Sequence, residues 1–505
     1  MEKQKVLSRY FGYDAFRPGQ EALIDAVLAG RDALGVMPTG AGKSLCYQIP
    51  ALMLTGITLV ISPLISLMQD QVTALVQAGV PAAYLNSSLS PAQFREALRR
   101  LEAGRYKLVY VAPERLALPG FQELCAKLPI TFVAVDEAHC ISQWGQDFRP
   151  DYLRIPAFLA ALPTRPVLGA YTATATAQVK GDIIAALDLR DPVTAATGFD
   201  RPNLFFAVRK PKSKNRALLQ EIEKHPNQSG IVYCATRKKV EAVCELLRSE
   251  GYAAGMYHAG MEKEARTQAQ EDFLHDRVQI MAATNAFGMG IDKSNVSFVI
   301  HYNMPASVEA YYQEAGRAGR DGEAADCVLL YSPGDVMTQR YLIEHSEPNP
   351  NLTEDEQEQV RQMDEQRLNQ MRNYALDHGC LRSHLLRYFG EKRYDRCGHC
   401  SNCLGLPRED DEGTIKLVKK ELRAKRNEDV ADPALFEALR QLRLSIAREQ
   451  QLKPFMVFSD ATLRSMCEVR PTTMGEFLTV SGVGETKAKR FGNAFLACIR
   501  ECVQQ

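Results

Sequence analysis

The sequence predicts an α/β protein with two tandem domains, each built on a parallel sheet, followed by helical segments. Short apolar runs rich in β-branched residues recur every few dozen residues, separated by amphipathic stretches such as residues 91–101. Strands that alternate with helices are typical of parallel sheets. The first series is "DALGVMP", "GITLVISP", "YKLVYVAP", "TFVAVDEAH" and "RPVLGAYTATA", and the second is "SGIVYCATR", "AAGMYHAG", "VQIMAATNAFG", "VSFVIHYN" and "ADCVLLYSP". Two tandem sheets imply a cleft between them.

Length and composition indicate an ordinary globular chain of about three to four domains, because single cores stop growing near roughly 250–300 residues and this chain has 505. Lys and Arg number 61, as do Asp and Glu, so any nucleic-acid binding must be local. The start lacks an apolar signal segment, and no run of about 18 apolar residues occurs. Thirteen cysteines suit a reducing cytosol. We expect a cytoplasmic protein without a membrane span.

The alternation of apolar strand-like runs and helical stretches stops after Ser332. The polar stretch "EHSEPNPNLTEDEQEQ" indicates a boundary, and residues 360–378 are expected to form a helix that leads to Cys380. A further break, "LGLPREDDEG", precedes a helical C-terminal segment from about Asp432. No repeat of solenoid length occurs.

The stretch "MPTGAGKSLCYQ" is a candidate phosphate-binding loop. Such a loop needs glycines whose N–H groups converge on phosphate oxygens, a lysine that reaches the β- and γ-phosphates, and a hydroxyl for Mg²⁺. Gly40, Gly42, Lys43 and Ser44 supply these groups. The usual pattern has glycine where this chain has Met37, so a plain glycine-rich turn is the alternative. The strand-like run before the loop and the helix-like run after it favour phosphate binding.

The run "FVAVDEAH" ends an apolar strand in Asp136, Glu137 and His139. Mg²⁺ prefers hard oxygen ligands and keeps several waters, so Asp136 is a candidate ligand. Glu137 is then placed to orient the attacking water. A solvated acidic loop is the commoner reading of such a pair, but a phosphate loop upstream in the same domain argues against it.

The run "QEAGRAGRDG" spans Gln313 to Gly322 in the second α/β domain. Arg317 and Arg320 are three residues apart, and we expect them on one face of a helix. Arginines of this kind stabilise charge on a transferred phosphoryl group, an effect of order 10³–10⁵ in rate in other nucleotide hydrolases. Solvated surface arginines are the alternative. A site divided between two domains would let ATP open and close the cleft.

Four cysteines form the pattern C-x₁₆-C-x₂-C-x₂-C: Cys380, Cys397, Cys400 and Cys403. Four thiolates close a tetrahedral zinc shell with no open position, which is the structural arrangement. His399 is an alternative ligand, but it adjoins Cys400 and is expected to be a bystander. Unliganded thiols are the other alternative.

Trp144 is the only tryptophan, and it follows the acidic motif in "DEAHCISQWGQDFRP". Any base can stack on an indole, a contact that contributes roughly 1–3 kcal/mol regardless of sequence. With Phe148 and Arg149, Trp144 therefore fits a sequence-tolerant reader of single strands. Core burial is the usual fate of tryptophan, but the polar flanks favour a loop.

The C-terminal run "FLTVSGVGETKAKRFG" contains a G-x-G turn before a predicted helix. Backbone N–H groups at the helix start suit a DNA phosphate. The cations expected beside it are Lys487, Lys489 and Arg490. A packing joint between two helices is the alternative.

Ten motifs of this sequence, in their order and context, resemble those of the RecQ family of DNA helicases. They are "FRPGQ", "PTGAGKS", "SPLISLM", "APERL", "DEAHCISQWGQDFRPDY", "TATA", "YCATRKKVE", "YHAG", "ATNAFGMGIDK" and "YYQEAGRAGRDG". The resemblance covers about residues 1–403 and the C-terminal segment. It implies two tandem RecA-like parallel-sheet domains, a small helical zinc-binding domain and a C-terminal all-helical domain of the helicase-and-RNase-D type. It also implies ATP, Mg²⁺ and Zn²⁺ as cofactors.

The same resemblance implies which residues bind and hydrolyse ATP and which residues contact DNA. Arg17 and Gln20 would contact adenine and Tyr13 would stack on it. Ser44 and Asp136 would hold Mg²⁺, and Gln313 would join the catalytic set, namely Lys43, Asp136, Glu137, Arg317 and Arg320. His258 would join the DNA contacts, and the loop with Trp144 would couple DNA to ATP hydrolysis.

The implied function is a 3′-to-5′ DNA helicase that acts on single-stranded and branched DNA in recombination and repair, at the bacterial nucleoid, with single-strand-binding protein as a further partner. An RNA-remodelling ATPase of the wider superfamily is one rival. A passive DNA-binding or strand-annealing scaffold is another, against which Lys43, Glu137 and Arg320 argue.

The expected domains are 1–200 and 201–334 for the two RecA-like domains, 335–403 for the zinc-binding domain and 431–505 for the helical C-terminal domain. RecQ members commonly carry a winged helix of roughly a hundred residues after the zinc cysteines, an ordinary domain size. Here only residues 404–430 lie there, a charged linker with one expected helix near 415–425. That length cannot build a core of its own.

Overall fold

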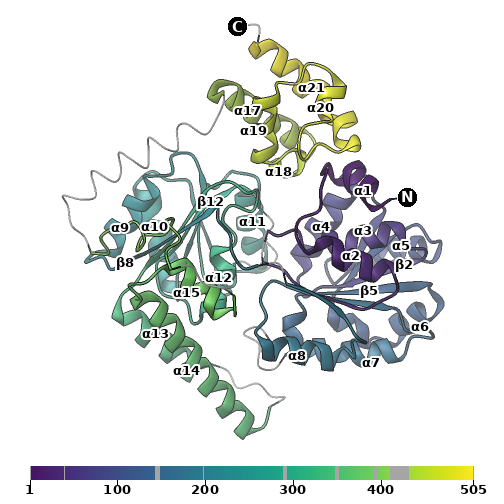
Figure 1. Cartoon of the computed structure of the whole chain (residues 1–505), viewed down its shortest axis with the longest axis horizontal. Helices are drawn as coiled ribbons and strands as arrows, with labels where there is room; N and C mark the ends of the chain where they lie inside the picture. The colour runs from purple at the N-terminus through teal and green to yellow at the C-terminus, as the bar shows by residue number, and fades with distance from the viewer. Residues whose placement is uncertain are drawn as a thin grey trace. The chain divides into compact units, whose positions relative to one another are not determined.

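A computed structural model of the chain describes residues 2–38, 40–142, 148–196, 198–287, 293–346, 352–391, 395–409 and 432–503 (Figure 1). The chain divides into two compact units. The first is built on Met1–Gly198 and the second on Phe199–Gly288 and Lys293–Arg470, while Pro471–Glu501 groups with the first.

In the first unit, the described residues form a seven-stranded sheet of order β3-β4-β2-β5-β6-β1-β7, and every pair is parallel. Helices α2, α3 and α4 lie along one side in Figure 1, and α6, α7 and α8 along the other. The strands are β1 (Ala33–Val36), β2 (Ile57–Ile61), β3 (Ala82–Leu85), β4 (Leu108–Val111), β5 (Ile130–Asp136), β6 (Val167–Thr172) and β7 (Val193–Ala196). Because helices cover both faces, the central strands are continuous apolar runs, and β2 is buried along its whole length.

Within residues 2–198 the helices are α1 (Lys3–Val6), α2 (Gln20–Leu28), α3 (Leu45–Met53), α4 (Ile65–Gln77), α5 (Pro91–Glu102), α6 (Pro119–Lys127), α7 (Ile155–Ala160) and α8 (Ala177–Ala186). Single turns η1 (Leu7–Phe11), η2 (Pro113–Ala117), η3 (Ala138–Ile141) and η4 (Pro150–Arg154) join them. The helix predicted at residues 91–101 is confirmed as α5, which starts with a capping box between Ser90 and Gln93.

In the second unit, the described residues form a six-stranded parallel sheet of order β10-β11-β9-β12-β13-β8. The strands are β8 (Leu204–Arg209), β9 (Ser229–Tyr233), β10 (Ala254–Tyr257), β11 (Ile280–Ala283), β12 (Val296–His301) and β13 (Ala325–Leu330). The helices are α9 (Lys214–Ile222), α10 (Arg237–Ser249), α11 (Lys263–Leu274) and α12 (Val308–Ala315). All ten strands expected from the apolar runs are confirmed.

Three strands were not expected: β3, β7 and β8. The signal of β3 and β7 is weak, because both are four-residue runs with two alanines each. Strand β8 is the apolar run "LFFAVR", which lies between polar residues before and after it. All three lie at sheet edges, where fewer neighbours demand apolar side chains.

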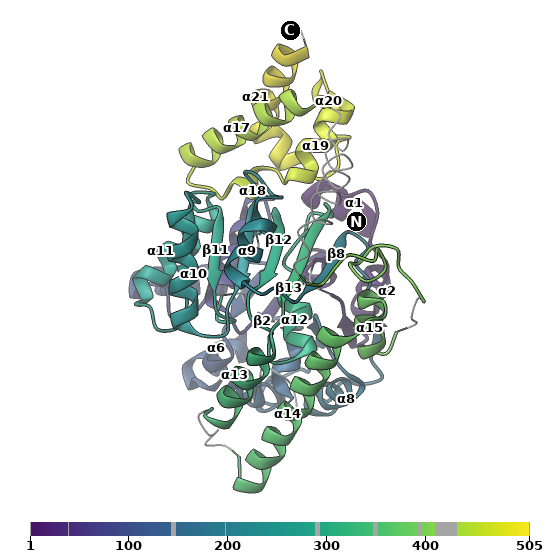
Figure 2. The same cartoon turned by 90° about the vertical axis from the view of Figure 1, so that its left-hand side faces the viewer.

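Beyond the second sheet lie α13 (Pro333–Glu344), α14 (Glu354–Leu376) and α15 (Leu381–Tyr388), and Figure 2 shows α13 and α14 side by side. The helix expected at 360–378 is confirmed, but it begins six residues earlier. Thr353 and Glu356 form a capping box there, so part of the stretch interpreted as a boundary is the first turn of α14.

The C-terminal segment consists of α17 (Pro433–Glu449), α18 (Pro454–Val457), α19 (Asp460–Val469), α20 (Met474–Phe477) and α21 (Glu485–Val503). Asp432 caps α17 as its side chain accepts from the Leu435 N–H, which confirms the expected start. The helix expected near residues 415–425 lies outside the described residues.

No helix within the described part of the chain is both long and apolar enough to cross a membrane.

Candidate functional site

The glycine-rich loop of the first unit leads from β1 into α3, with Ser44 immediately before the helix. Gly40 and Gly42 both have left-handed backbones, with φ of 86° and 80°. At Gly42 a Cβ atom would also meet the Gln20 side-chain nitrogen at 2.5 Å. The left-handed backbone favours glycine at this position, whereas the Gln20 side chain could shift to make room for a Cβ atom.

Lys43 faces the two carboxylates at the end of β5, the strand that lies between β2 and β6. Its Nζ lies 2.6 Å from Glu137 Oε1 and 3.3 Å from Asp136 Oδ1. Burial alone would lower the pKa of Lys43, but the charges of Asp136 and Glu137 outweigh it and raise that pKa. The lysine stays charged in this position.

The backbone turns sharply at Glu137, which has a φ of 47°. A non-glycine residue in this region is costly and is found mostly at functional sites. The Glu137 N–H donates to Asp136 Oδ1 at 3.0 Å, and the Tyr152 hydroxyl donates to the Asp136 carbonyl at 2.7 Å. These bonds hold the turn that aims both carboxylates at Lys43.

His139 joins this turn to the neighbouring strand β6. Its Nδ1 lies 2.7 Å from Thr172 Oγ1 and 3.3 Å from Glu137 Oε2. The Thr172 hydroxyl donates in turn to the Thr174 carbonyl at 3.1 Å. Sequence reasoning assigned no role to Thr172; the run "TATA" was noted only as part of the resemblance.

Gln20 and Arg17, expected at adenine, lie against the glycine loop. The Gln20 amide donates to the Ala41 and Gly42 carbonyls at 3.2 and 2.9 Å, while its oxygen accepts from the Arg17 N–H at 2.8 Å. The Arg17 guanidinium donates to the Gly40 carbonyl. Tyr13 is exposed. Their contact with a base stays a prediction.

The site can hold a nucleoside triphosphate with Mg²⁺. The loop offers backbone N–H groups and the Lys43 ammonium to phosphates. Ser44 and Asp136 offer hard oxygen ligands to the metal. Glu137 lies next to Lys43 and Asp136, where its carboxylate could orient a water molecule that attacks the phosphate.

The prediction that Arg317 and Arg320 lie on one face of a helix is wrong. Helix α12 ends at Ala315, and both arginines follow it in a turn. Glycine ends the helix at Gly316, and Gly319 continues with a φ of 55°, which a helix does not allow. Gln313 lies on α12 itself and is half-buried.

The expected DNA contacts are spread over several elements. Trp144 lies outside the described residues. Phe148 is half-buried, and the Arg149 guanidinium donates to the Pro63 carbonyl at 3.2 Å. His258 is buried, with Nε2 3.4 Å from Glu241.

On α21, Lys489 and Arg490 are exposed. Lys487 on the same helix is half-buried, and burial lowers its pKa to about 8. Cationic side chains thus remain on the surface of this helix, and their contact with DNA stays a prediction.

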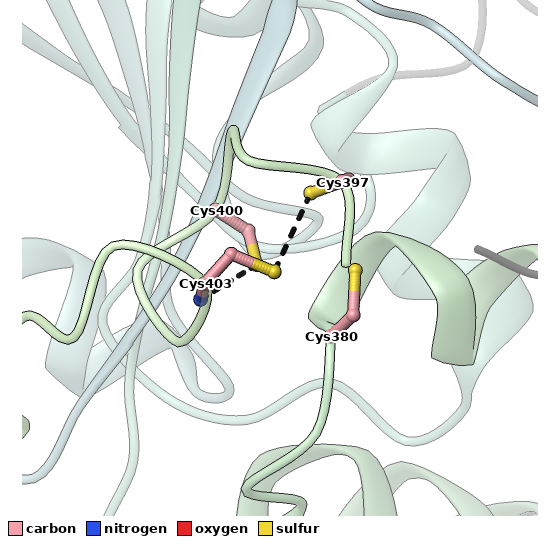
Figure 3. Close-up of side chains that lie close together, drawn as sticks. All are labelled: Cys380, Cys397, Cys400 and Cys403. Atoms are coloured by element: carbon pink, nitrogen blue, oxygen red, sulfur yellow. Dashed lines mark hydrogen bonds between the residues drawn. The ribbon is translucent and has the colours of Figure 1, made fainter. Parts of the chain in front are cut away.

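The four cysteines of the zinc pattern come together in the second unit (Figure 3). Cys380 precedes α15, and the other three lie in one loop: Cys397, Cys400 and Cys403. Their sulfur atoms all lie within 4.8 Å of one another, and the Cys397 and Cys403 sulfurs are 3.9 Å apart. Zinc–sulfur bonds of about 2.3 Å in a tetrahedron give a sulfur separation of roughly 3.8 Å.

Backbone N–H groups point at three of these sulfurs. Ser383, His399 and Cys403 donate to the sulfurs of Cys380, Cys397 and Cys400 respectively. Such bonds favour the thiolate form that a metal needs. His399 lies against the ring of Phe205 and outside the cysteine cluster, as expected for a bystander. The residues present therefore fit Zn²⁺ with four thiolate ligands.

The cysteine loop also covers the edge strand β8. Cys400 forms an isolated parallel β-bridge with Phe206, and the Ser401 N–H donates to the Phe206 carbonyl at 2.9 Å. Further along, the Lys210 N–H donates to the Arg408 carbonyl at 2.6 Å. The loop thus satisfies backbone groups that the edge of the sheet would otherwise expose. No local pattern predicts this pairing, because the cysteine loop, "CGHCSNCLGLPR", does not read as a strand.

Four protein-family models match the chain. They are the DEAD/DEAH box helicase (residues 17–181), the helicase conserved C-terminal domain (213–322), the RecQ zinc-binding domain (333–404) and the HRDC domain (432–499).

Several curated proteins are similar over most of the chain. ATP-dependent DNA helicase RecQ of Bacillus subtilis is 40% identical, covering 98% of this chain and 97% of the relative. RecQ of Haemophilus influenzae is 38% identical over 98% and 95%. A mimivirus protein described as an ATP-dependent RNA helicase, R290, is 42% identical over 80% and 72%.

Solved structures of helicases are similar in fold to a large part of this chain. The helicase MrfA bound to DNA and AMPPNP has a TM-score of 0.54 at 21% identity, covering 78% of this chain and 58% of its own. Mss116p bound to ssRNA and AMP-PNP has a TM-score of 0.54 at 18% identity, covering 65% and 72%. At these identities the likeness concerns the fold alone.

Proposed function

We propose that this chain, which belongs to the RecQ family of ATP-dependent DNA helicases, uses ATP hydrolysis at Lys43 to move 3′-to-5′ along single-stranded DNA. The observation that carries the proposal is the Nζ of Lys43, 2.6 Å from Glu137 and 3.3 Å from Asp136 at the end of a central parallel strand. A charged lysine, a metal ligand and a water-orienting carboxylate are what phosphoryl transfer to water requires.

The proposed roles follow from the chemistry of each group. Gly40, Gly42 and Lys43 bind the phosphates. Ser44 and Asp136 hold Mg²⁺, and Glu137 orients the attacking water. Arg317 and Arg320 of the second unit stabilise charge on the transferred group, with Gln313 beside them. Tyr13, Arg17 and Gln20 bind the base, and DNA is held by Trp144, Phe148, Arg149, His258, Lys487, Lys489 and Arg490.

The proposed substrates are single-stranded and branched DNA in recombination and repair, with single-strand-binding protein as a partner at the bacterial nucleoid in the cytoplasm. The domain limits proposed above accompany these roles: 1–200, 201–334, 335–403 and 431–505.

The decisive experiment is steady-state ATP hydrolysis with equal concentrations of single-stranded DNA and RNA, followed by unwinding of duplexes with a 3′ or a 5′ single-stranded tail. The proposal expects stimulation by DNA and unwinding from the 3′-tailed duplex. Preferential stimulation by RNA would favour the RNA-remodelling alternative, which the mimivirus relative keeps open. Binding of DNA without any stimulated hydrolysis would favour the passive scaffold.

We further propose that this chain lacks the winged helix. Its alignments to the two bacterial RecQ proteins extend over 584 and 600 residues, against 505 in this chain, so at least 79 positions of the shorter alignment have no counterpart here. The zinc-binding match ends at 404 and the HRDC match begins at 432. The interval between these two matches is the proposed place of the gap.

A further inference from the structure

The turn that follows α12 carries Arg317 through a buried place where the helical hydrogen bonds have ended. Residues 314–319 are all buried, and Arg317 is 9% exposed. Carbonyls at the end of a helix have no partner within the helix, and a buried carbonyl without a partner is costly. The carbonyls of this turn therefore need donors from another part of the chain.

Arg201 supplies these donors. Its guanidinium donates hydrogen bonds to the carbonyls of Gly316 at 2.6 Å, Ala318 at 3.0 Å and Gly319 at 2.5 Å. Bonds from a charged donor are roughly twice as strong as neutral ones, and the planar fork of a guanidinium fixes their directions. Gly316 is also the C-cap of α12, so the positive charge lies at the end that the helix dipole makes negative.

Two further contacts hold the same turn. The Gly319 N–H donates to the carbonyl of Val296, at the start of β12, at 2.9 Å. The Asn203 amide donates to the carbonyls of Gly319 at 3.0 Å and Glu323 at 2.7 Å. The fit is close, because a Cβ atom at Gly319 would meet the Glu323 carbonyl oxygen at 2.6 Å. The turn is thus bonded both to β12 and to the segment that precedes β8.

Arg201 is held in turn by its neighbours in the second unit. The Arg382 guanidinium, on α15, donates to the Arg201 carbonyl at 2.7 Å and to the Asp200 carboxylate at 2.5 Å. The Tyr312 hydroxyl, on α12, donates to the Phe199 carbonyl at 2.6 Å. The segment from which Arg201 reaches the turn therefore has its own backbone fixed.

We propose that Arg201 is a positioning residue for Arg317. The carbonyls of Gly316 and Ala318 flank Arg317, so the bonds from Arg201 fix the direction of its Cα–Cβ bond and the point from which its guanidinium extends. Asn203 supports the same turn. The inference rests on the proposed role of Arg317 in ATP hydrolysis. Arg201 acts through the turn and does not itself touch the nucleotide.

The test is steady-state ATP hydrolysis by the full chain with saturating single-stranded DNA, and the variant is Arg201→Lys. Lysine keeps the positive charge and a long stem, but a single ammonium does not reproduce the fork that meets three carbonyls. A misplacement of about 1 Å can cost roughly 10²-fold, so we expect kcat to fall by about 10- to 100-fold. The KM for ATP should stay within about twofold, because the interaction with Arg317 is made in the transition state. Normal kcat would overturn the proposal.

The matched control is Arg209→Lys. Arg209 is a half-buried arginine at the end of β8 in the same unit, and its guanidinium donates to Glu221 at 2.5 Å and Gln220 at 3.2 Å. This variant should keep normal kcat. A loss as large as that in Arg201→Lys would mean that loosening of the second unit lowers kcat, and it would overturn the positioning role.

Arg317→Ala and the double variant separate the two ideas. Normal kcat in Arg317→Ala would overturn the proposed role of Arg317 itself. A slow Arg317→Ala with a normal Arg201→Lys would overturn only the positioning role. In the double variant the combined loss should be clearly smaller than the product of the two single losses, because both changes act through one group. Losses that multiply would mean that Arg201 acts elsewhere.

Folding is checked by far-UV circular dichroism and thermal melting. Should Arg201→Lys fold poorly, Asn203→Ala is the milder change, since it removes only the two bonds that the Asn203 amide donates to the turn. We expect kcat to fall by at least about threefold with an unchanged KM for ATP, because the turn is then less well held. Normal kcat in Asn203→Ala would show that bonds to the turn do not control kcat, and it would contradict the proposal.

Discussion

The single ammonium of Lys43 lies beside the carboxylates of Asp136 and Glu137 and offsets part of their mutual repulsion. Asp136 is 3% exposed, and Glu137 is half-buried beside it. Removing one partner of a buried ion pair leaves uncompensated charge and typically costs 3–5 kcal/mol. Lys43 therefore contributes to the stability of the first unit, in addition to its proposed role in phosphate binding.

Lys43→Ala should abolish ATP hydrolysis and leave binding of single-stranded DNA largely intact, because the charge at the phosphates is lost and the DNA contacts are not. It should also lower the melting temperature. Hydrolysis, DNA titration and thermal melting measure the three effects. Lys107→Ala is the matched control, since this half-buried lysine of the same unit donates to the Leu54 carbonyl at 2.9 Å and makes no ion pair among the described residues. Normal turnover in Lys43→Ala would refute the phosphate-loop assignment.

Trp144→Ala tests the proposed coupling between DNA and hydrolysis. DNA-stimulated hydrolysis and unwinding should fall far more than single-strand affinity, because many backbone contacts remain. Fluorescence titration and hydrolysis at the same salt concentration provide the comparison. A proportional loss of affinity, or no change at all, would contradict the sensor role.

At the scale of elements, the cysteine loop (residues 397–408) and the edge strand β8 hold each other in place by hydrogen bonds. The Val208 N–H donates to Ser401 Oγ at 3.3 Å, and the Lys210 N–H donates to the Arg408 carbonyl. Both donors belong to β8 or follow it directly. The four clustered cysteines thus fix a loop whose backbone and side chains hydrogen-bond to the edge of the second sheet.

Cys397→Ser should give a zinc-poor and less stable protein, because a structural zinc contributes folding energy. We also expect faster hydrogen exchange at the Val208 and Lys210 amides. Atomic absorption and mass-spectrometric hydrogen exchange measure the two effects. Cys502→Ser is the control, since Cys502 is half-exposed on α21 and lies outside the cluster. Full zinc content in Cys397→Ser would contradict the assignment of this ligand.

Arg382 joins the zinc-binding helices to the second sheet. It is 4% exposed and donates to the carbonyls of Arg201 at 2.7 Å and Leu204 at 2.6 Å. The Arg201 guanidinium donates hydrogen bonds to three carbonyls of the turn that carries Arg317, those of Gly316 at 2.6 Å, Ala318 at 3.0 Å and Gly319 at 2.5 Å. The zinc region and the arginine turn therefore share one hydrogen-bonded support within the second unit.

At the scale of the whole molecule, the proposed absence of a winged helix concerns how duplex DNA is held. Winged helices of the family grip the duplex ahead of the junction. A chain without one should bind single strands normally, bind duplex and fork DNA weakly, and unwind long duplexes with poor processivity.

Titration of one labelled single strand and one labelled fork at matched salt tests this expectation, since affinities compared across salts mean little. ATP hydrolysis on single strands should be retained in the same preparation. Fork binding much tighter than single-strand binding would mean that another element grips the duplex.

The sequence by itself determined the two parallel sheets, because their central strands are apolar runs that only burial on both faces explains. It also determined the phosphate loop, the acidic pair and the cysteine set, since these chemistries depend on residue type and spacing. Tertiary structure alone decided the turn at Arg317, where Gly316 and Gly319 end a helix that charge spacing had suggested. It also decided which segment pairs with the edge of strand β8, namely the cysteine loop. This pairing joins residues far apart in the chain, and no local pattern encodes which distant partner a backbone edge will meet.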